Sequence, residues 1–94
     1  PKEKEWLMKV LNVVNYMESS KLWRDKIVQI TVSDGGELSL VPRIGQEVFL
    51  FGQPDDIEDK FRKMEMYYRN IVPEKGASHY TRVSVEYEGQ IVCR

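Results

Sequence analysis

The chain has 94 residues, of which 41% are hydrophobic and 31% are charged, a balance typical of a globular domain and not of a disordered or membrane-spanning chain. Fourteen basic and fifteen acidic residues leave a formal net charge of −1, so the basic footprint of a nucleic-acid-binding protein is lacking. No apolar run approaches the roughly 20 residues that cross a bilayer. We therefore expect a single domain over residues 1–94, with no nucleic-acid partner.

The first predicted element is an amphipathic helix over residues 3–19. Polar residues occupy one side of it, while apolar residues recur at helical spacing on the other. This apolar stripe consists of Leu7, Val10, Leu11, Val14 and Met17. Ser19-Ser20 ends the pattern, and Leu22-Trp23 predicts a short apolar turn before the chain extends.

Three short strands are predicted next, at residues 27–32, 37–41 and 47–51. The first, IVQITV, is rich in β-branched residues. The turn at residues 34–36 contains two glycines, which adopt positive φ angles at little cost, and Pro42 ends the second strand. Because short turns join neighbouring strands, an antiparallel meander is expected.

A second helix is predicted after residues 52–56, where the apolar period changes from that of a strand to that of a helix. Its apolar stripe consists of Ile57, Phe61, Met64, Tyr68 and Ile71. The residues expected to stay in solvent are Glu58, Lys60, Arg62, Lys63 and Glu65. Asp55 and Glu58 have the spacing of a capping box, and Pro73 and Gly76 are expected to end the helix.

The chain closes on residues 82–94, RVSVEYEGQIVCR, which predict two strands joined at Glu88-Gly89, the second running from Gln90 to Arg94. The whole pattern predicts an α+β fold: a largely antiparallel sheet, formed by the meander and the C-terminal hairpin, with two helices packed on one face. A strand that ends a chain can also end a sheet, and its outer backbone groups are then unpaired.

The sequence contains no pattern typical of a catalytic or metal-binding site. The densest acidic cluster comprises Asp55, Asp56, Glu58 and Asp59. It lies in the first turn of a predicted helix, where carboxylates favour the helix dipole, so capping is preferred over metal binding. His79 is the only histidine and has no nucleophile pattern around it, and the single cysteine, Cys93, is expected to behave as a small hydrophobic residue. We expect no enzyme activity, cofactor or small-molecule substrate.

Two long stretches resemble a known family. They are LSLVPRIGQEVFLFGQPDDIEDKFRKMEMYYRNIVPEKG and HYTRVSVEYEGQIVCR, and the similarity is strongest over Val41–Lys60 and Tyr80–Cys93. They resemble the C-terminal periplasmic β-domain of the FtsQ/DivIB cell-division proteins, which is an antiparallel sheet with helices against it. Ala77 stands where many relatives carry a tryptophan.

The resemblance implies a non-enzymatic divisome scaffold domain that binds FtsB- and FtsL-like partners and helps regulate septal peptidoglycan synthesis. It also implies a periplasmic domain of a single-pass inner-membrane protein, whose membrane helix and POTRA domain are outside these 94 residues. The family binds FtsB by β-augmentation, in which a partner strand adds to the C-terminal edge. The residues that the resemblance assigns to this contact are Tyr87, Gln90, Ile91, Val92, Cys93, Arg82 and Glu86.

Two alternative functions remain open at this point. A POTRA-like periplasmic assembly or chaperone domain also uses strand addition, but it places two helices between its strands. A small-ligand or metal-binding periplasmic domain would use Asp55, Asp56 and His79. The strand order decides whether the edge hypothesis survives, because an internal position for residues 90–94 would remove the proposed binding surface.

Overall fold

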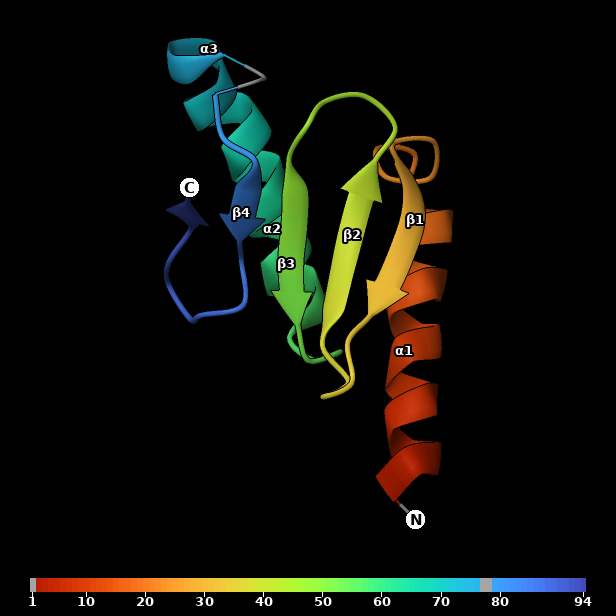
Figure 1. The fold of residues 1–94 in the computed structure, drawn as a ribbon. Helices are drawn as coiled ribbons and strands as arrows, with labels where there is room; N and C mark the ends of the chain where they lie inside the picture. Colours follow the sequence, from red (N-terminus) through yellow and green to blue (C-terminus); the bar gives the residue numbers. More distant parts are fainter. Residues whose placement is uncertain (1, 77–78) are drawn as a thin grey trace.

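The computed structural model describes residues 2–76 and 79–94, so Ala77 lies outside the described residues (Figure 1). Five strands form one sheet in the order β1-β2-β3-β4-β5. The strands are β1 (Ile27–Val32), β2 (Leu38–Pro42), β3 (Val48–Gly52), β4 (Arg82–Ser84) and β5 (Val92–Cys93). The helical segments are α1 (Lys2–Ser19) and a continuous run of α2 (Ile57–Met66), the π-helix η1 (Tyr67–Ile71) and α3 (Val72–Lys75). The predicted α+β fold is confirmed.

The sheet is antiparallel except for one pair. Strands β1, β2 and β3 form the predicted meander, and β4 pairs antiparallel with β5. Strands β3 and β4 are parallel, with Val48 opposite Arg82 and Leu50 opposite Ser84. A parallel pair needs a long crossover, which the α2–η1–α3 segment supplies. Periodicity alone does not indicate strand direction, so this pair was not foreseen.

The core lies between the sheet and the helices. Alternate residues of β2, β3 and β4 point toward it, and the helices contribute the opposing side chains. The largest buried side chains are Tyr67, Phe49, Phe51, Phe61, Leu38, Leu40 and Met64. Figure 1 shows the sheet in front of α2, with α1 beside β1. The face of the sheet that is turned away from α2 is not covered by any described helix.

Helix α1 is rotated from the orientation that its sequence predicts. Val13 is fully buried, whereas Leu7 and Leu11 of the predicted stripe are about half exposed. The cause is Trp6, which turns toward the sheet and donates a hydrogen bond from its indole N–H to the Gly36 carbonyl at 3.0 Å. The helix therefore keeps a second apolar strip in solvent.

The ends of the second helical segment also differ from the prediction. Asp56 is the N-cap of α2 with a φ of 47°, and no side chain caps the helix, so the predicted capping box is wrong. Asp55 instead pairs with the Lys60 ammonium at 2.9 Å. Pro73 does not end the segment as predicted, because it lies in the first turn of α3 directly after the π-helix, and the segment ends at Gly76 with a φ of 93°.

Candidate functional site

Strand β5 is an edge of the sheet, as the proposed binding surface requires. Within the described residues it pairs with β4, and Cys93 lies opposite Val83. The ladder continues past the strand, because the Arg94 N–H donates to the Arg82 carbonyl at 2.9 Å and the Arg82 N–H donates to the Arg94 carbonyl at 3.2 Å. The strand is shorter than the predicted span from Gln90 to Arg94.

The hydrogen bonds of Arg94 determine which backbone groups face the free edge. In an antiparallel ladder, successive residues direct their peptide groups alternately toward and away from the neighbouring strand. Since the Arg94 peptide groups bond to β4, those of Val92 also face β4. The N–H and C=O groups of Cys93 and Ile91 therefore face outward, away from β4. These two residues offer the backbone row to which another strand could add.

The side chains of the seven predicted contact residues lie on two different faces of the sheet. Ile91 and Cys93 pack against the core, and burial raises the pKa of the Cys93 thiol, which keeps it neutral. The other five line a groove of about 350 Å³ on the open face. These five are Arg82, Glu86, Tyr87, Gln90 and Val92. We call this hollow, which Leu50, Ser84 and Arg94 complete, the β5 groove.

The β5 groove has an apolar floor and a polar rim. Leu50, Ser84 and Val92 lie opposite one another on β3, β4 and β5 and form a row across its floor. Tyr87 is 55% exposed, so its ring is available at the rim. Aromatic residues are enriched in protein interfaces, so the exposed Tyr87 ring makes this groove the candidate site.

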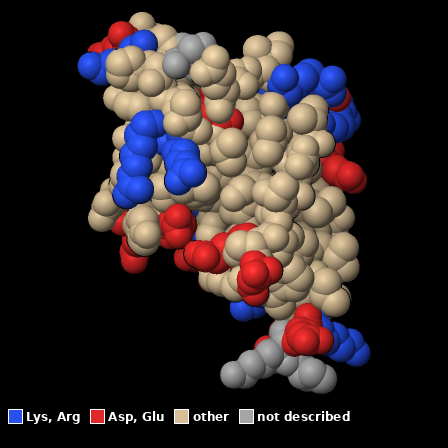
Figure 2. All heavy atoms as spheres, viewed as in Figure 1, with Lys and Arg blue, Asp and Glu red and all other residues tan. Residues whose placement is uncertain are grey.

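Charge is unbalanced at one end of this groove. Arg82 and Arg94 are directly opposed on neighbouring strands, where like charges repel. Neither forms an ion pair with any described residue, and Glu86 accepts a hydrogen bond from the Ser84 hydroxyl at 3.1 Å. Figure 2 shows basic side chains gathered over the β4–β5 end of the sheet, with acidic ones below them. This end suits a carboxylate.

A family model described as FtsQ/DivIB, C-terminal related, matches residues 1–94. The chain belongs to this family. The resemblance read from the two sequence stretches is thereby confirmed, and membership suggests a role in cell division. A search of curated proteins finds no match. Among the described helices of this FtsQ/DivIB-related chain, none combines the length and the apolar character that a bilayer crossing needs.

Lys63 is a functional candidate that sequence reasoning placed in solvent. Its side chain is buried at 6% exposure, and its ammonium donates to the Val85 carbonyl at 3.0 Å and to the Tyr87 carbonyl. Asp59 lies 3.6 Å from the same ammonium. Lys63 thus ties α2 to the segment that leads into β5 and positions Tyr87 in this family member.

A second lysine of α2 is buried in the same manner. The Lys60 ammonium donates to the Gln53 carbonyl at 2.8 Å and lies 5.0 Å from the centre of the Phe51 ring. A polar helical position gives no sequence signal for such a role, because lysines in helices usually remain in solvent. In this FtsQ/DivIB-related fold, both lysines donate hydrogen bonds to backbone carbonyls outside regular strands and helices, which would otherwise lack these donors.

The residues of the alternative metal-site hypothesis are not brought together. Asp55 is engaged by Lys60, and His79 packs edge-on against Tyr80. No three Asp, Glu, His or Cys side chains in the described ranges gather where they could hold a metal. A single helical segment joins β3 to β4, and α1 precedes the meander, which differs from the POTRA arrangement of two helices between strands.

Glu47, Tyr67 and Tyr68 form a largely buried polar cluster in this FtsQ/DivIB-related chain. The Tyr68 hydroxyl donates to Glu47 Oε1 at 3.0 Å, while Glu47 Oε2 and the Tyr67 hydroxyl have no partner among the described residues. Burial raises the pKa of both phenols, and the Glu47 charge raises them further, because it opposes a phenolate. Both tyrosines therefore stay protonated in the folded state.

We expect the free energy of unfolding to fall as the pH rises above about 10, the ordinary tyrosine pKa. Because the pKa values of Tyr67 and Tyr68 are raised in the folded state, the unfolded state loses its phenol protons at a lower pH than the folded state does. The protonated phenols therefore contribute their full stabilisation below about pH 10, and this contribution is lost as the pH rises further. Urea unfolding between about pH 8 and pH 11 measures the slope. Tyr68→Phe should reduce it, and an unchanged slope would contradict this assignment.

Proposed function

We propose that the chain is a non-enzymatic divisome domain that binds an FtsB-like segment by accepting it as a strand beside β5. The observation that carries the proposal is the position of β5 at the end of the sheet, with the peptide groups of Ile91 and Cys93 directed outward. Family membership supports the cell-division role. Residues 1–94 would act as one periplasmic domain of a single-pass inner-membrane protein, and an FtsL-like protein would join the complex to regulate septal peptidoglycan synthesis.

The β5 groove supports the same proposal through its side chains. An added strand would place alternate side chains on the open face, next to the apolar floor and the Tyr87 ring. A tyrosine that a partner covers can contribute a large share of the binding energy, because it buries a rigid ring and offers a hydroxyl. The unpaired Arg82 and Arg94 favour a partner segment with a carboxylate at this end.

The test of this site is Tyr87→Ala, which we expect to weaken binding of a synthetic FtsB-like segment by about tenfold or more, as at interface hot spots. Because the ring is largely exposed, the variant should unfold at nearly the same urea concentration as the parent chain. Calorimetric titration of the segment into each protein gives the affinity. Leu22→Ala is the matched control, since it removes another exposed apolar side chain at the β1 end of the fold.

Ile91→Pro tests the backbone edge separately from the groove. Proline removes the outward N–H, and because it also removes the Ile91 side chain from the core, Ile91→Ala is the control that loses the packing but keeps the N–H. We expect binding to be lost while unfolding shows a folded protein. If both variants bind with the parent affinity, the proposed site is wrong.

A further inference from the structure

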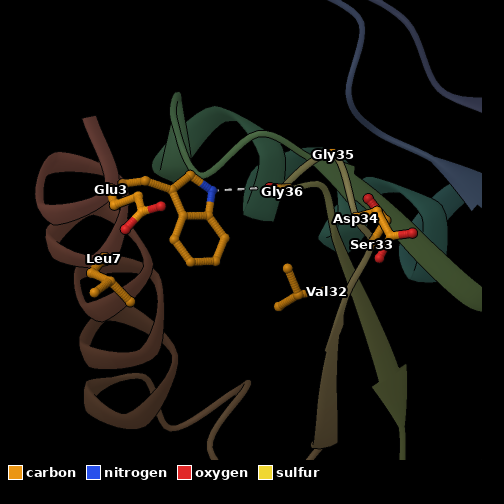
Figure 3. A pocket seen from close by; sticks show the side chains of 8 residues that line it. Glu3, Leu7, Val32, Ser33, Asp34, Gly35 and Gly36 are labelled. Atoms are coloured by element: carbon orange, nitrogen blue, oxygen red, sulfur yellow. Dashed lines mark hydrogen bonds between the residues drawn. The ribbon is translucent and has the colours of Figure 1, made fainter. Parts of the chain in front are cut away.

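A second apolar groove lies at the opposite end of the sheet, between α1 and β1. It has a volume of about 520 Å³ and is lined by Trp6 and Leu7 from the helix, by Val32 from the strand, and by the turn that follows β1. Figure 3 shows Leu7 on the helix and Val32 on the strand, on opposite sides of the space. We call this hollow the α1–β1 groove.

The α1–β1 groove is a built feature and not a gap left by loose packing. The hydrogen bond from the Trp6 indole to the Gly36 carbonyl fixes the end of α1 to the β1–β2 turn at 3.0 Å. Leu7 and Val32 are each about half exposed, and Leu11 continues the apolar strip one helical turn further along α1. The rigid frame therefore holds aliphatic side chains open to solvent.

Strand β1 also offers unpaired backbone groups along this groove. The Ser33 N–H donates to the Glu37 carbonyl at 2.9 Å, which shows that Ser33 faces β2. By the alternation of an antiparallel ladder, Thr31 faces β2 as well, whereas Ile30 and Val32 direct their peptide groups outward. The strand IVQITV contains no proline or charged residue, two of the devices that protect an edge, and Val28 and Val32 remain about half exposed beside α1.

The charge around the groove is acidic. Glu3 on α1 and Asp34 in the turn contribute carboxylates, and no basic residue is among the residues that line it. Neither carboxylate forms an ion pair with a described residue. This sign is opposite to that of the arginine end of the β5 groove, so the two grooves select different partners.

We propose that the α1–β1 groove binds an extended polypeptide segment that adds to β1 as a strand. The segment would insert an aliphatic side chain between Leu7 and Val32 and place a lysine or arginine next to Glu3 and Asp34. The domain would then accept one strand at each end of its sheet. This site is independent of the proposed binding at β5.

The experiment is an NMR titration of the 94-residue chain with a capped hexapeptide, Lys-Val-Thr-Val-Thr-Lys, and with the same peptide carrying glutamate in place of lysine. We expect the lysine peptide to shift the Trp6 indole N–H, the Leu7 methyl groups and the amides of Ile30 and Val32. Its affinity should fall as salt is added, because exposed charges are screened. The glutamate peptide should bind about two- to fivefold more weakly, the range that an exposed ion pair contributes.

Leu7→Ser and Met8→Ser form a matched pair for the groove, because the two side chains are 54% and 56% exposed on the same helix and only Leu7 lines the groove. We expect Leu7→Ser to lower the affinity for the lysine peptide by about tenfold and Met8→Ser to leave this affinity unchanged. Asp34→Asn should reduce the salt dependence, and adding Glu3→Gln should remove most of the rest.

Three results would overturn the proposal. They are equal binding of the two peptides, shifts confined to β5, and shifts at β1 that depend on protein concentration without peptide. The last would mean that a second copy of the chain occupies the edge.

Discussion

Lys63→Met is expected to lower the free energy of unfolding by about 3 kcal/mol, because it removes two hydrogen bonds from a buried ammonium. Methionine keeps the packing of the aliphatic stem, so the loss reports on the polar contacts. The Val85 carbonyl would lose this donor, and the Tyr87 carbonyl would keep only the Gln90 N–H at 3.3 Å. Desolvated carbonyls that lose a hydrogen bond are costly. Urea unfolding at neutral pH measures the change.

Arg62→Met is the matched control for this experiment. Arg62 is the preceding residue of α2, and it also pairs with Asp59, at 3.7 Å, but its side chain lies in solvent. Exposed pairs of this type contribute about 0.5 kcal/mol. Similar losses for the two variants would mean that the contacts of Lys63 carry no more weight than a surface ion pair.

The same substitution separates positioning from direct contact. Lys63 holds the segment that carries Tyr87 but does not line the β5 groove. At low temperature, where Lys63→Met remains folded, we expect weaker binding of the FtsB-like segment together with broadened Tyr87 resonances. Tyr87→Ala, in contrast, should weaken binding without changing the mobility of its neighbours.

The sequence predicted the meander well because its strands alternate in polarity and are bounded by glycine and proline. Strand β3 (Val48–Gly52) is shifted by only one residue from the expected span of 47–51. The closing hairpin was predicted less well: β4 and β5 are short, and the segment between them extends over residues 85–91. That segment is held by Lys63 from α2, a contact between distant residues that no local pattern contains.

The candidate site was only partly predictable for a similar reason. The residues of the C-terminal edge were named from family resemblance, and their type is compatible with a strand. Their division between two faces follows from the alternation of β5, which places Val92 in the groove and Cys93 on the core. The arginine pair depends on the register of β4 against β5, and register is set by tertiary packing that sequence does not display.

Gly52→Ala is expected to cost about 3 kcal/mol, through a strained backbone and a steric clash. Gly52 ends β3 with a φ of 78°, a conformation that alanine adopts only with strain. An added Cβ would also lie 2.8 Å from the Glu86 Cβ, which is closer than non-bonded carbon atoms approach in proteins. The wall of the β5 groove formed by Glu86 would have to move, so partner binding should weaken along with stability.

Gly89→Ala isolates the steric part of this loss. Gly89 has a φ of 69°, but no atom lies within 4 Å of the Cβ that alanine would add. Its substitution should therefore cost only the backbone strain, about 1 kcal/mol. The difference between the two variants in urea unfolding measures how tightly β3 and the Glu86 segment are packed. If the two losses are equal, the close approach of Gly52 to Glu86 does not contribute to stability.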